Sequence, residues 1–191
     1  MKITFVLSRL NLSGGVRIVA EHASMLHQLG HTVTVVSAVQ QRPSLKNQLW
    51  TILKGKSVRK RENKSHLDGA PYKVHVLDQP GDVKVDDVPD ADLIIETWWQ
   101  TAEWIEEMPA SKGVKVNFLQ HYEAHSWVPK DRVDAVWRSP MRKIVVSEWL
   151  NGISKNQFND HTAILVSNGI DTTNFRFRER GLSGHKRVGT M

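Results

Sequence analysis

Short apolar runs alternate with amphipathic segments along most of the chain. The apolar runs are rich in β-branched residues and predict strands at residues 3–8, 32–39, 72–77, 93–97, 115–119, 143–147 and 164–167. Their apolarity is continuous, which is typical of parallel strands that helices cover on both faces. Helical spacing predicts a helix after residue 13 and others at 44–54, 99–108, 133–138 and 148–158. The pattern therefore predicts an α/β fold, with a Rossmann-like, doubly wound, mainly parallel sheet of about seven strands.

The first 39 residues carry the clearest unit of this pattern. Ser13 can cap the first helix, the apolar residues between Val16 and Leu29 recur at helical spacing, and Gly30 can end the helix. Strand, glycine loop, helix and strand make a βαβ unit with a right-handed crossover. Ligands bind such sheets at the carboxyl ends of the strands, so the loops after the strands hold the candidate site.

The loop after the first strand contains Asn11 and the pair Gly14-Gly15. Glycines at a helix start let the backbone approach a ligand, and the free amides there suit a phosphate or diphosphate; a tight turn is the other interpretation. A dinucleotide-binding dehydrogenase needs G-x-G-x-x-G in this loop and an acidic residue near the end of the second strand. Neither feature is present, since no Asp or Glu occurs between Thr32 and Arg61.

Aromatic and polar residues follow the fourth and fifth predicted strands. The candidate sugar-binding or catalytic residues here are Thr97, Trp98, Trp99, His121, Tyr122 and Glu123. The CH face of a pyranose stacks on an indole while its hydroxyls need polar partners, so these loops suit a sugar. A place in the core is the alternative for the two tryptophans. Ser147, after the sixth strand, is a candidate for ligand contact or for capping the next helix.

Charge is concentrated in one segment. The net charge is +6, and residues 42–64 alone contribute +7 through eight basic residues against Glu62, which leaves −1 for the rest. A nucleic-acid partner is disfavoured, because it needs a broad basic face. This segment could instead form a peripheral helix that contacts an anionic membrane. No cysteine and no apolar run of roughly 18 residues occurs, so we expect a cytoplasmic protein, peripheral at most to the inner face of the membrane.

The combined motifs resemble the retaining glycosyltransferases of family GT4, which have the two-domain GT-B architecture. The resemblance lies in Ser13-Gly14-Gly15, in residues 29–35, in residues 144–150, and in Asn168-Gly169-Ile170-Asp171 with Phe175. Residues 97–99 and 120–123 are also similar to members that transfer rhamnose or related sugars to bacterial surface polysaccharides.

The resemblance implies roles for three candidate residues, and the chemistry of the loops assigns the others. Gly14 and Gly15 would approach the diphosphate of a nucleotide sugar, and His121 would lie near the anomeric carbon. The residues assigned to the acceptor or sugar are Asn11, Thr97, Trp98, Trp99, Tyr122, Glu123 and Ser147. No cofactor and no protein-bound metal is expected, because amides and basic side chains can stabilise the leaving diphosphate.

The same resemblance implies a domain organisation. Residues 1–177 would form the N-terminal, acceptor-side domain and 178–191 an interdomain linker, while the donor-binding domain and its pair of glutamates are expected to be missing. The partners would be a nucleotide sugar and a glycan or lipid-linked acceptor, and the chain alone would transfer nothing. A non-catalytic ligand-binding or regulatory α/β domain is the alternative, since fold does not fix function.

Overall fold

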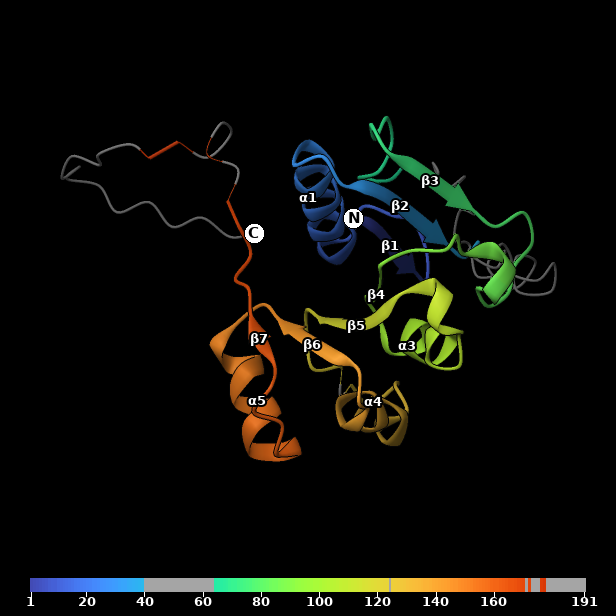
Figure 1. The fold of residues 1–191 in the computed structure, drawn as a ribbon. Coiled ribbons are helices and arrows are strands. Elements are labelled where there is room, and N and C mark those ends of the chain that lie inside the picture. Colours follow the sequence, from blue (N-terminus) through green and yellow to red (C-terminus); the bar gives the residue numbers. More distant parts are fainter. Residues whose placement is uncertain (40–63, 124, 171, 173–175, 178–191) are drawn as a thin grey trace, which may run out of the picture.

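The computed structural model describes residues 1–39, 64–123, 125–170, 172 and 176–177, which form one parallel sheet with helices on both faces (Figure 1). The strands are β1 (Lys2–Leu7), β2 (Thr32–Ser37), β3 (Lys73–Val76), β4 (Leu93–Glu96), β5 (Val114–Leu119), β6 (Arg142–Val145) and β7 (Ile164–Leu165). The helices are α1 (Gly14–Gln28), α3 (Trp99–Glu106), α4 (Lys130–Arg138) and α5 (Glu148–Phe158), with short 3₁₀ turns η1 (Val85–Asp87) and η2 (Ala110–Lys112).

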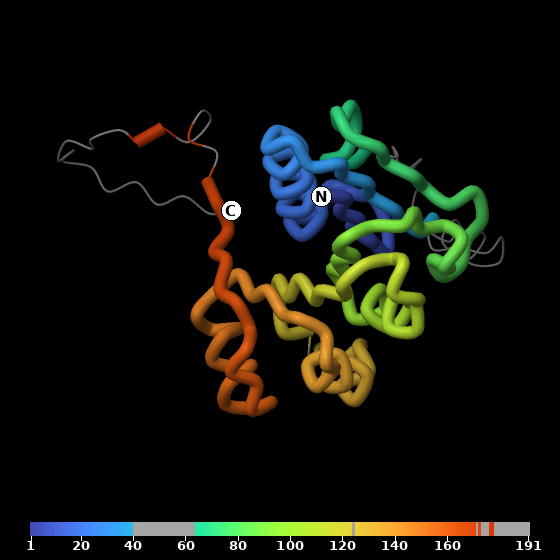
Figure 2. The backbone as a smooth tube through the Cα atoms, viewed as in Figure 1, coloured from blue at the N-terminus to red at the C-terminus, as the bar shows by residue number. Residues whose placement is uncertain are grey.

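The strand order is β3-β2-β1-β4-β5-β6-β7, and every neighbouring pair is parallel. The chain starts in the middle of the sheet, builds outward to β3, returns to β4 and then builds outward to β7 (Figure 2). The direction of winding therefore reverses between β1 and β4. The predicted α/β, Rossmann-like fold is confirmed.

Two hydrophobic cores fill the space between the sheet and the helices. Alternate residues of β1 show the division, since Ile3 and Phe5 belong to the core beneath α1 and Val6 to the opposite core. The helices α3, α4 and α5 cover the second face, where the indole of Trp137 is fully buried. Helices of successive right-handed crossovers in one direction share a face, which explains why α3, α4 and α5 lie together and α1 lies on the other face among the described helices.

Most predicted boundaries agree with the structure to within two residues. Ser13 caps α1 as expected, and Gly30 follows the helix with a φ of +86°. The helix α4 begins at Lys130, three residues earlier than predicted. Its first turn is polar and follows Pro129, so the apolar spacing on which the prediction relied does not include this turn. The sixth strand ends at Val145 and the seventh at Leu165, each two residues earlier than predicted.

Several expectations fall on residues outside the described ranges. The predicted helix at 44–54, nearly all of the basic segment 42–64 and the predicted linker 178–191 belong to this group. Among the described helices, none has the length and apolarity needed to cross a bilayer.

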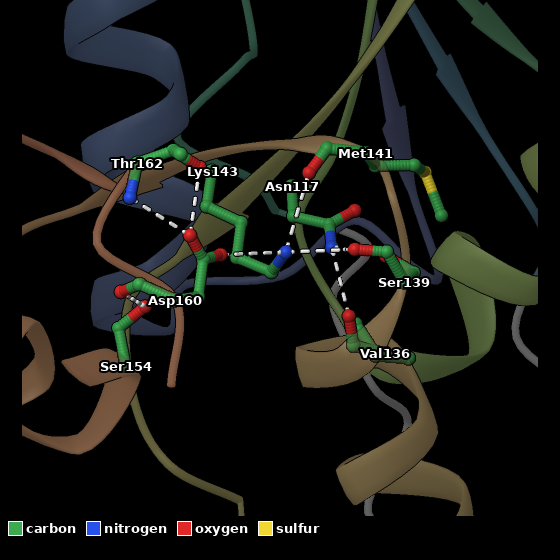
Figure 3. Close-up of polar contacts among 8 residues, drawn as sticks. All are labelled: Asn117, Val136, Ser139, Met141, Lys143, Ser154, Asp160 and Thr162. Carbon is green, nitrogen blue, oxygen red and sulfur yellow. Dashed lines mark hydrogen bonds and ion pairs between the residues drawn. The ribbon is translucent and has the colours of Figure 1, made fainter. Parts of the chain in front are cut away.

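A buried polar cluster joins β5, β6 and the turn before β7 at the amino edge of the sheet (Figure 3). Lys143 is only 4% exposed, and its Nζ lies 2.9 Å from a carboxylate oxygen of Asp160 and donates to the carbonyls of Ser139 (2.8 Å) and Met141 (3.3 Å). Beside it, the Asn117 amide donates to the Ser139 hydroxyl (3.1 Å). We call Lys143, Asp160, Ser139 and Asn117 the amino-edge clasp; it ties the last two strands to α4.

Candidate functional site

A cavity of about 420 Å³ opens where the winding of the sheet reverses, at the carboxyl ends of β1 and β4. The loops after these two strands turn toward opposite faces of the sheet, which leaves a space between them. Its lining among the described residues is Leu7, Ser8, Arg9, Asn11, Ser13, Gly15, Val16, Ala38, Val39, Gly81, Asp82, Thr97, Trp98, Gln100, Trp104, Gln120 and Trp127. The candidate site predicted at this edge is thus a concave one.

The lining combines three indole rings with neutral hydrogen-bonding groups. The indoles are Trp98, Trp104 and Trp127, and the neutral polar side chains are Ser8, Asn11, Ser13, Thr97, Gln100 and Gln120. The two charged side chains, Arg9 and Asp82, have opposite signs. Such a surface offers flat apolar faces and many donors and acceptors without a dominant charge, which suits a neutral ligand rich in hydroxyl groups.

The start of α1 forms one wall of this cavity. The Ser13 hydroxyl accepts from the Val16 amide at 3.5 Å, and the Asn11 side chain accepts from the Ser13 amide at 2.9 Å. Neither Gly14 nor Gly15 has a positive φ, so the pair follows ordinary helical geometry and is not required by a strained turn. Both glycines are exposed, which leaves the first amides of the helix accessible.

An open groove of about 610 Å³ lies on the other side of Gly15. Its lining consists of Gly14, Gly15, Arg17, Ile18, Glu21, Gln120, Asn168, Gly169 and Ile170. The Gln120 amide donates to the Gly15 carbonyl at 3.4 Å and lines both the groove and the cavity. The start of α1 thus faces two adjoining spaces that Gln120 separates.

The end of β4 holds two predicted residues in the cavity wall. The Thr97 hydroxyl donates to the Val6 carbonyl at 3.2 Å, which fixes this loop to the end of β1. The indole of Trp98 donates to the side-chain oxygen of Gln100 at 3.2 Å, and both residues line the cavity. With Asn11 and Gly15, these are the predicted residues that the structure brings together there.

Three other predicted residues lie away from the cavity. Trp99 is 8% exposed and packs in the core, with the Arg132 guanidinium 4.3 Å above its ring. Tyr122 packs against the same core and donates its hydroxyl to Asp134 at 2.8 Å. The Ser147 hydroxyl accepts from the Leu150 amide at 3.3 Å and caps α5. Their positions favour structural roles over the sugar contacts expected of them.

Glu123 is directed beneath the first turn of α3, where it meets Glu96. Glu96, fully buried at the end of β4, accepts from the Trp98 amide at 2.7 Å, and Glu123 accepts from the Trp99 amide at 3.4 Å. Burial raises the pKa of Glu96 well above its ordinary value, and the charge of Glu123 raises it further. Burial also raises the pKa of Glu123 to about 8. The void these residues line measures only about 10 Å³, too small for a sugar.

His121 lies exposed on the loop after β5, outside the lining of the cavity. Its ring stacks on that of His125 at a centroid distance of 5.3 Å and meets the edge of Trp149 at 5.6 Å. In the described part of the chain, no three His, Asp or Glu side chains gather as a metal site would require.

Sequence reasoning missed several cavity residues. Gln120 directly follows β5 and belongs to the stretch 120–123 that carries the resemblance, but it was not predicted as a site residue. Asp82 and Trp127 come from long irregular loops, where no periodic pattern indicates which side chains turn inward.

The chain was also compared with known proteins. No protein-family model matches it, and the search of curated proteins returns no match.

Proposed function

We propose that this domain is the acceptor-side, N-terminal half of a retaining glycosyltransferase. The reaction moves a sugar from a nucleoside diphosphate sugar to a hydroxyl group of a glycan or a lipid-linked acceptor. The observation that carries the proposal is the cavity between β1 and β4, with its three indoles, its neutral polar groups and its offsetting charges. The motif resemblance to family GT4 supplies the reaction class.

The cavity and the adjoining groove would each bind a different substrate. The cavity suits the acceptor sugar, while the groove at the start of α1 presents exposed helix amides to an anionic group such as a diphosphate, although its Arg17 is paired with Glu21. Gly14 and Gly15 would contact that diphosphate, and His121 would lie beside the transferred sugar, as the resemblance implies. Binding of both substrates across Gly15 and Gln120 would bring them close together.

In the reaction, the acceptor hydroxyl oxygen bonds to the anomeric carbon while the bond from that carbon to the diphosphate oxygen breaks. The hydroxyl proton passes to the leaving diphosphate, so atoms and charge balance without a further reactant. Helix amides can stabilise the negative charge that develops on the leaving group. The resemblance implies that the donor-gripping glutamates belong to a second domain, so the residues described here would contribute the acceptor side of the reaction.

Saccharide titration of the purified chain, followed by tryptophan fluorescence, tests this proposal. We expect a neutral saccharide to change the fluorescence, and Trp127→Ala to abolish the change without altering the melting temperature, since Trp127 is 72% exposed. Met25→Ala is the control, because Met25 is 59% exposed and lines neither space. Absence of saccharide binding would contradict the proposal.

A further inference from the structure

Five aromatic rings form a continuous row along the carboxyl edge of the sheet. In order they are Trp98, Trp127, His125, His121 and Trp149, with successive centroids 6.5, 5.5, 5.3 and 5.6 Å apart. The first four are near-parallel, and the fifth meets His121 edge to face. This ring row starts at the end of β4, follows the loop after β5 and ends on the first turn of α5.

The ring row is open to solvent over most of its length. Trp127 is 72% exposed and Trp149 is 56% exposed, and both histidines also belong to the exposed residues. Centroid distances of this size correspond to offset stacking, which leaves part of each ring face uncovered. Exposed aromatic residues that gather in one place indicate a binding surface more strongly than the same residues scattered singly.

Among the described residues, the contacts of the row favour a neutral ligand over a nucleic acid. A single strand of nucleic acid would also stack on aromatic rings, but it needs a basic groove that follows its phosphates. Among the described residues, the guanidinium-over-ring contacts fall on Trp99 and Phe158, outside the row. Where the row enters the cavity, Arg9 is offset by Asp82.

We propose that the ring row is a platform for a saccharide chain of several units. One end of the chain lies in the cavity against Trp98 and Trp127, and the following units extend over the histidines to Trp149. This inference rests on the proposed function, and it specifies the substrate class: the acceptor and product are oligosaccharides, longer than a single sugar. His121 lies within the row, so a product chain covers the position where the new bond forms.

The test measures affinity against chain length. The probes are glucose-, galactose- and rhamnose-based linear oligosaccharides of one to six units, titrated into the purified chain by calorimetry. We expect the tetrasaccharide to bind on the order of tenfold or more tightly than the monosaccharide, because each additional unit covers further ring surface. Trp149→Ala should remove most of this gain and leave monosaccharide affinity unchanged, whereas Trp127→Ala should weaken both.

A matched control variant is Ile164→Ala, because Ile164 and Trp149 are both 56% exposed and Ile164 lies outside the row. Monosaccharide binding with no gain from length would overturn the platform and leave the proposed function standing. Binding of no saccharide would overturn both. Preferential, salt-sensitive binding of a thymidine oligonucleotide would overturn the platform in favour of a nucleic-acid surface.

Discussion

Buried charges occur at both edges of the sheet, and the two edges arrange them in opposite ways. At the amino edge, Lys143 faces the opposite charge of Asp160 and two backbone carbonyls. At the carboxyl edge, Glu96 and Glu123 bring like charges to the first turn of α3. A charged side chain that faces an opposite charge can be buried in its ionised form. Two neighbouring carboxyl groups repel each other when both are ionised, so burial favours the form in which at least one of them keeps its proton.

The pKa values of the acids reflect this difference. Burial alone would raise the pKa of Asp160, but hydrogen bonds from Thr162 and Lys143 lower it to about 2. The pKa of Glu123 rises to about 8 because burial is opposed only by the Trp99 amide. Strongly shifted carboxyl groups of the second kind are typical of functional edges, while those of the first kind are typical of structural ion pairs. The ion pair at the amino edge is thus buried with both partners charged, whereas burial at the carboxyl edge favours the protonated form of Glu96 and Glu123.

Replacing the clasp lysine should produce the largest loss of stability. In Lys143→Met the apolar volume is kept, but the Asp160 carboxylate and the carbonyls of Ser139 and Met141 lose their partner. Breaking a buried pair from one side costs about 3 to 5 kcal/mol. Urea unfolding followed by tryptophan fluorescence measures this loss.

The control for that variant is Arg17→Met, which removes an exposed pair between Arg17 and Glu21 on α1. A pair of this kind contributes only about 0.3 to 0.5 kcal/mol. If Lys143→Met cost no more than Arg17→Met, the clasp would not stabilise the amino edge.

Gly113→Ala should rank second. Gly113 precedes β5 at the amino edge with a φ of +102°, and a Cβ there would lie 2.7 Å from the backbone of Asp92 and Leu93. Backbone strain and steric overlap together should cost about 2 to 4 kcal/mol in urea unfolding. A loss below about 1 kcal/mol would show that the turn can shift to accept a side chain.

Gly113 also illustrates what the sequence could and could not predict. The apolar runs and helical spacing predicted all seven strands and the described helices, because each pattern is local. The need for glycine at 113 depends on Asp92, which lies on a different loop, so nothing near residue 113 indicates it. The sequence instead suggested a special role for the pair Gly14-Gly15, although neither residue has a positive φ.

The candidate site, like the fold, could be predicted from the sequence only in part. The edge of the sheet and the residues directly after β1 and β4 could be predicted, because parallel strands place their carboxyl ends together. The direction of side chains within a loop could not, which is why Glu123 was expected to bind sugar but lies beneath α3. Its meeting with Glu96, 27 positions earlier, depends on the pairing of β4 with β5.

The third prediction concerns pH. Glu123 keeps its proton to about pH 8 when folded, compared with an ordinary value of 4.5. Between these values the folded state binds more protons than the unfolded state, so stability should fall as pH rises and level off above about 8. Glu123→Gln mimics the protonated acid and should remove about 1.4 kcal/mol per pH unit of this slope.

Urea unfolding at pH 5, 6.5 and 8 measures the slope in both proteins. The residual slope of the variant combines Glu96, whose pKa is also raised, with His22, whose pKa burial lowers and whose contribution therefore has the opposite sign. Asp160→Asn is the control that should leave this slope unchanged, because the low pKa of Asp160 gives stability that is fully present above 3.8 and is lost only as pH falls through about 2. Parallel slopes for wild type and Glu123→Gln would contradict the assignment.

The last prediction has the smallest effect on folding and returns to Gly15. Its backbone is helical, and a Cβ there would lie 3.6 Å from the Gln120 side-chain oxygen, an ordinary contact distance. Valine is at least as good a helix former as glycine, so Gly15→Val should change stability by less than about 1 kcal/mol. Its methyl groups would nevertheless enter the boundary between cavity and groove, both of which Gly15 lines.

Calorimetric titration with the tightest-binding oligosaccharide and with inorganic pyrophosphate separates the two effects. Gly15→Val should weaken both ligands on the order of tenfold, since crowding a packed contact costs about 1 to 3 kcal/mol. Gly14→Val is the matched variant, because Gly14 lines only the groove and a Cβ there meets nothing within 4 Å. It should weaken pyrophosphate alone. Unchanged affinities in Gly15→Val would separate the start of α1 from ligand binding, whereas unfolding of this variant would place Gly15 with Gly113 among the glycines that the fold itself requires.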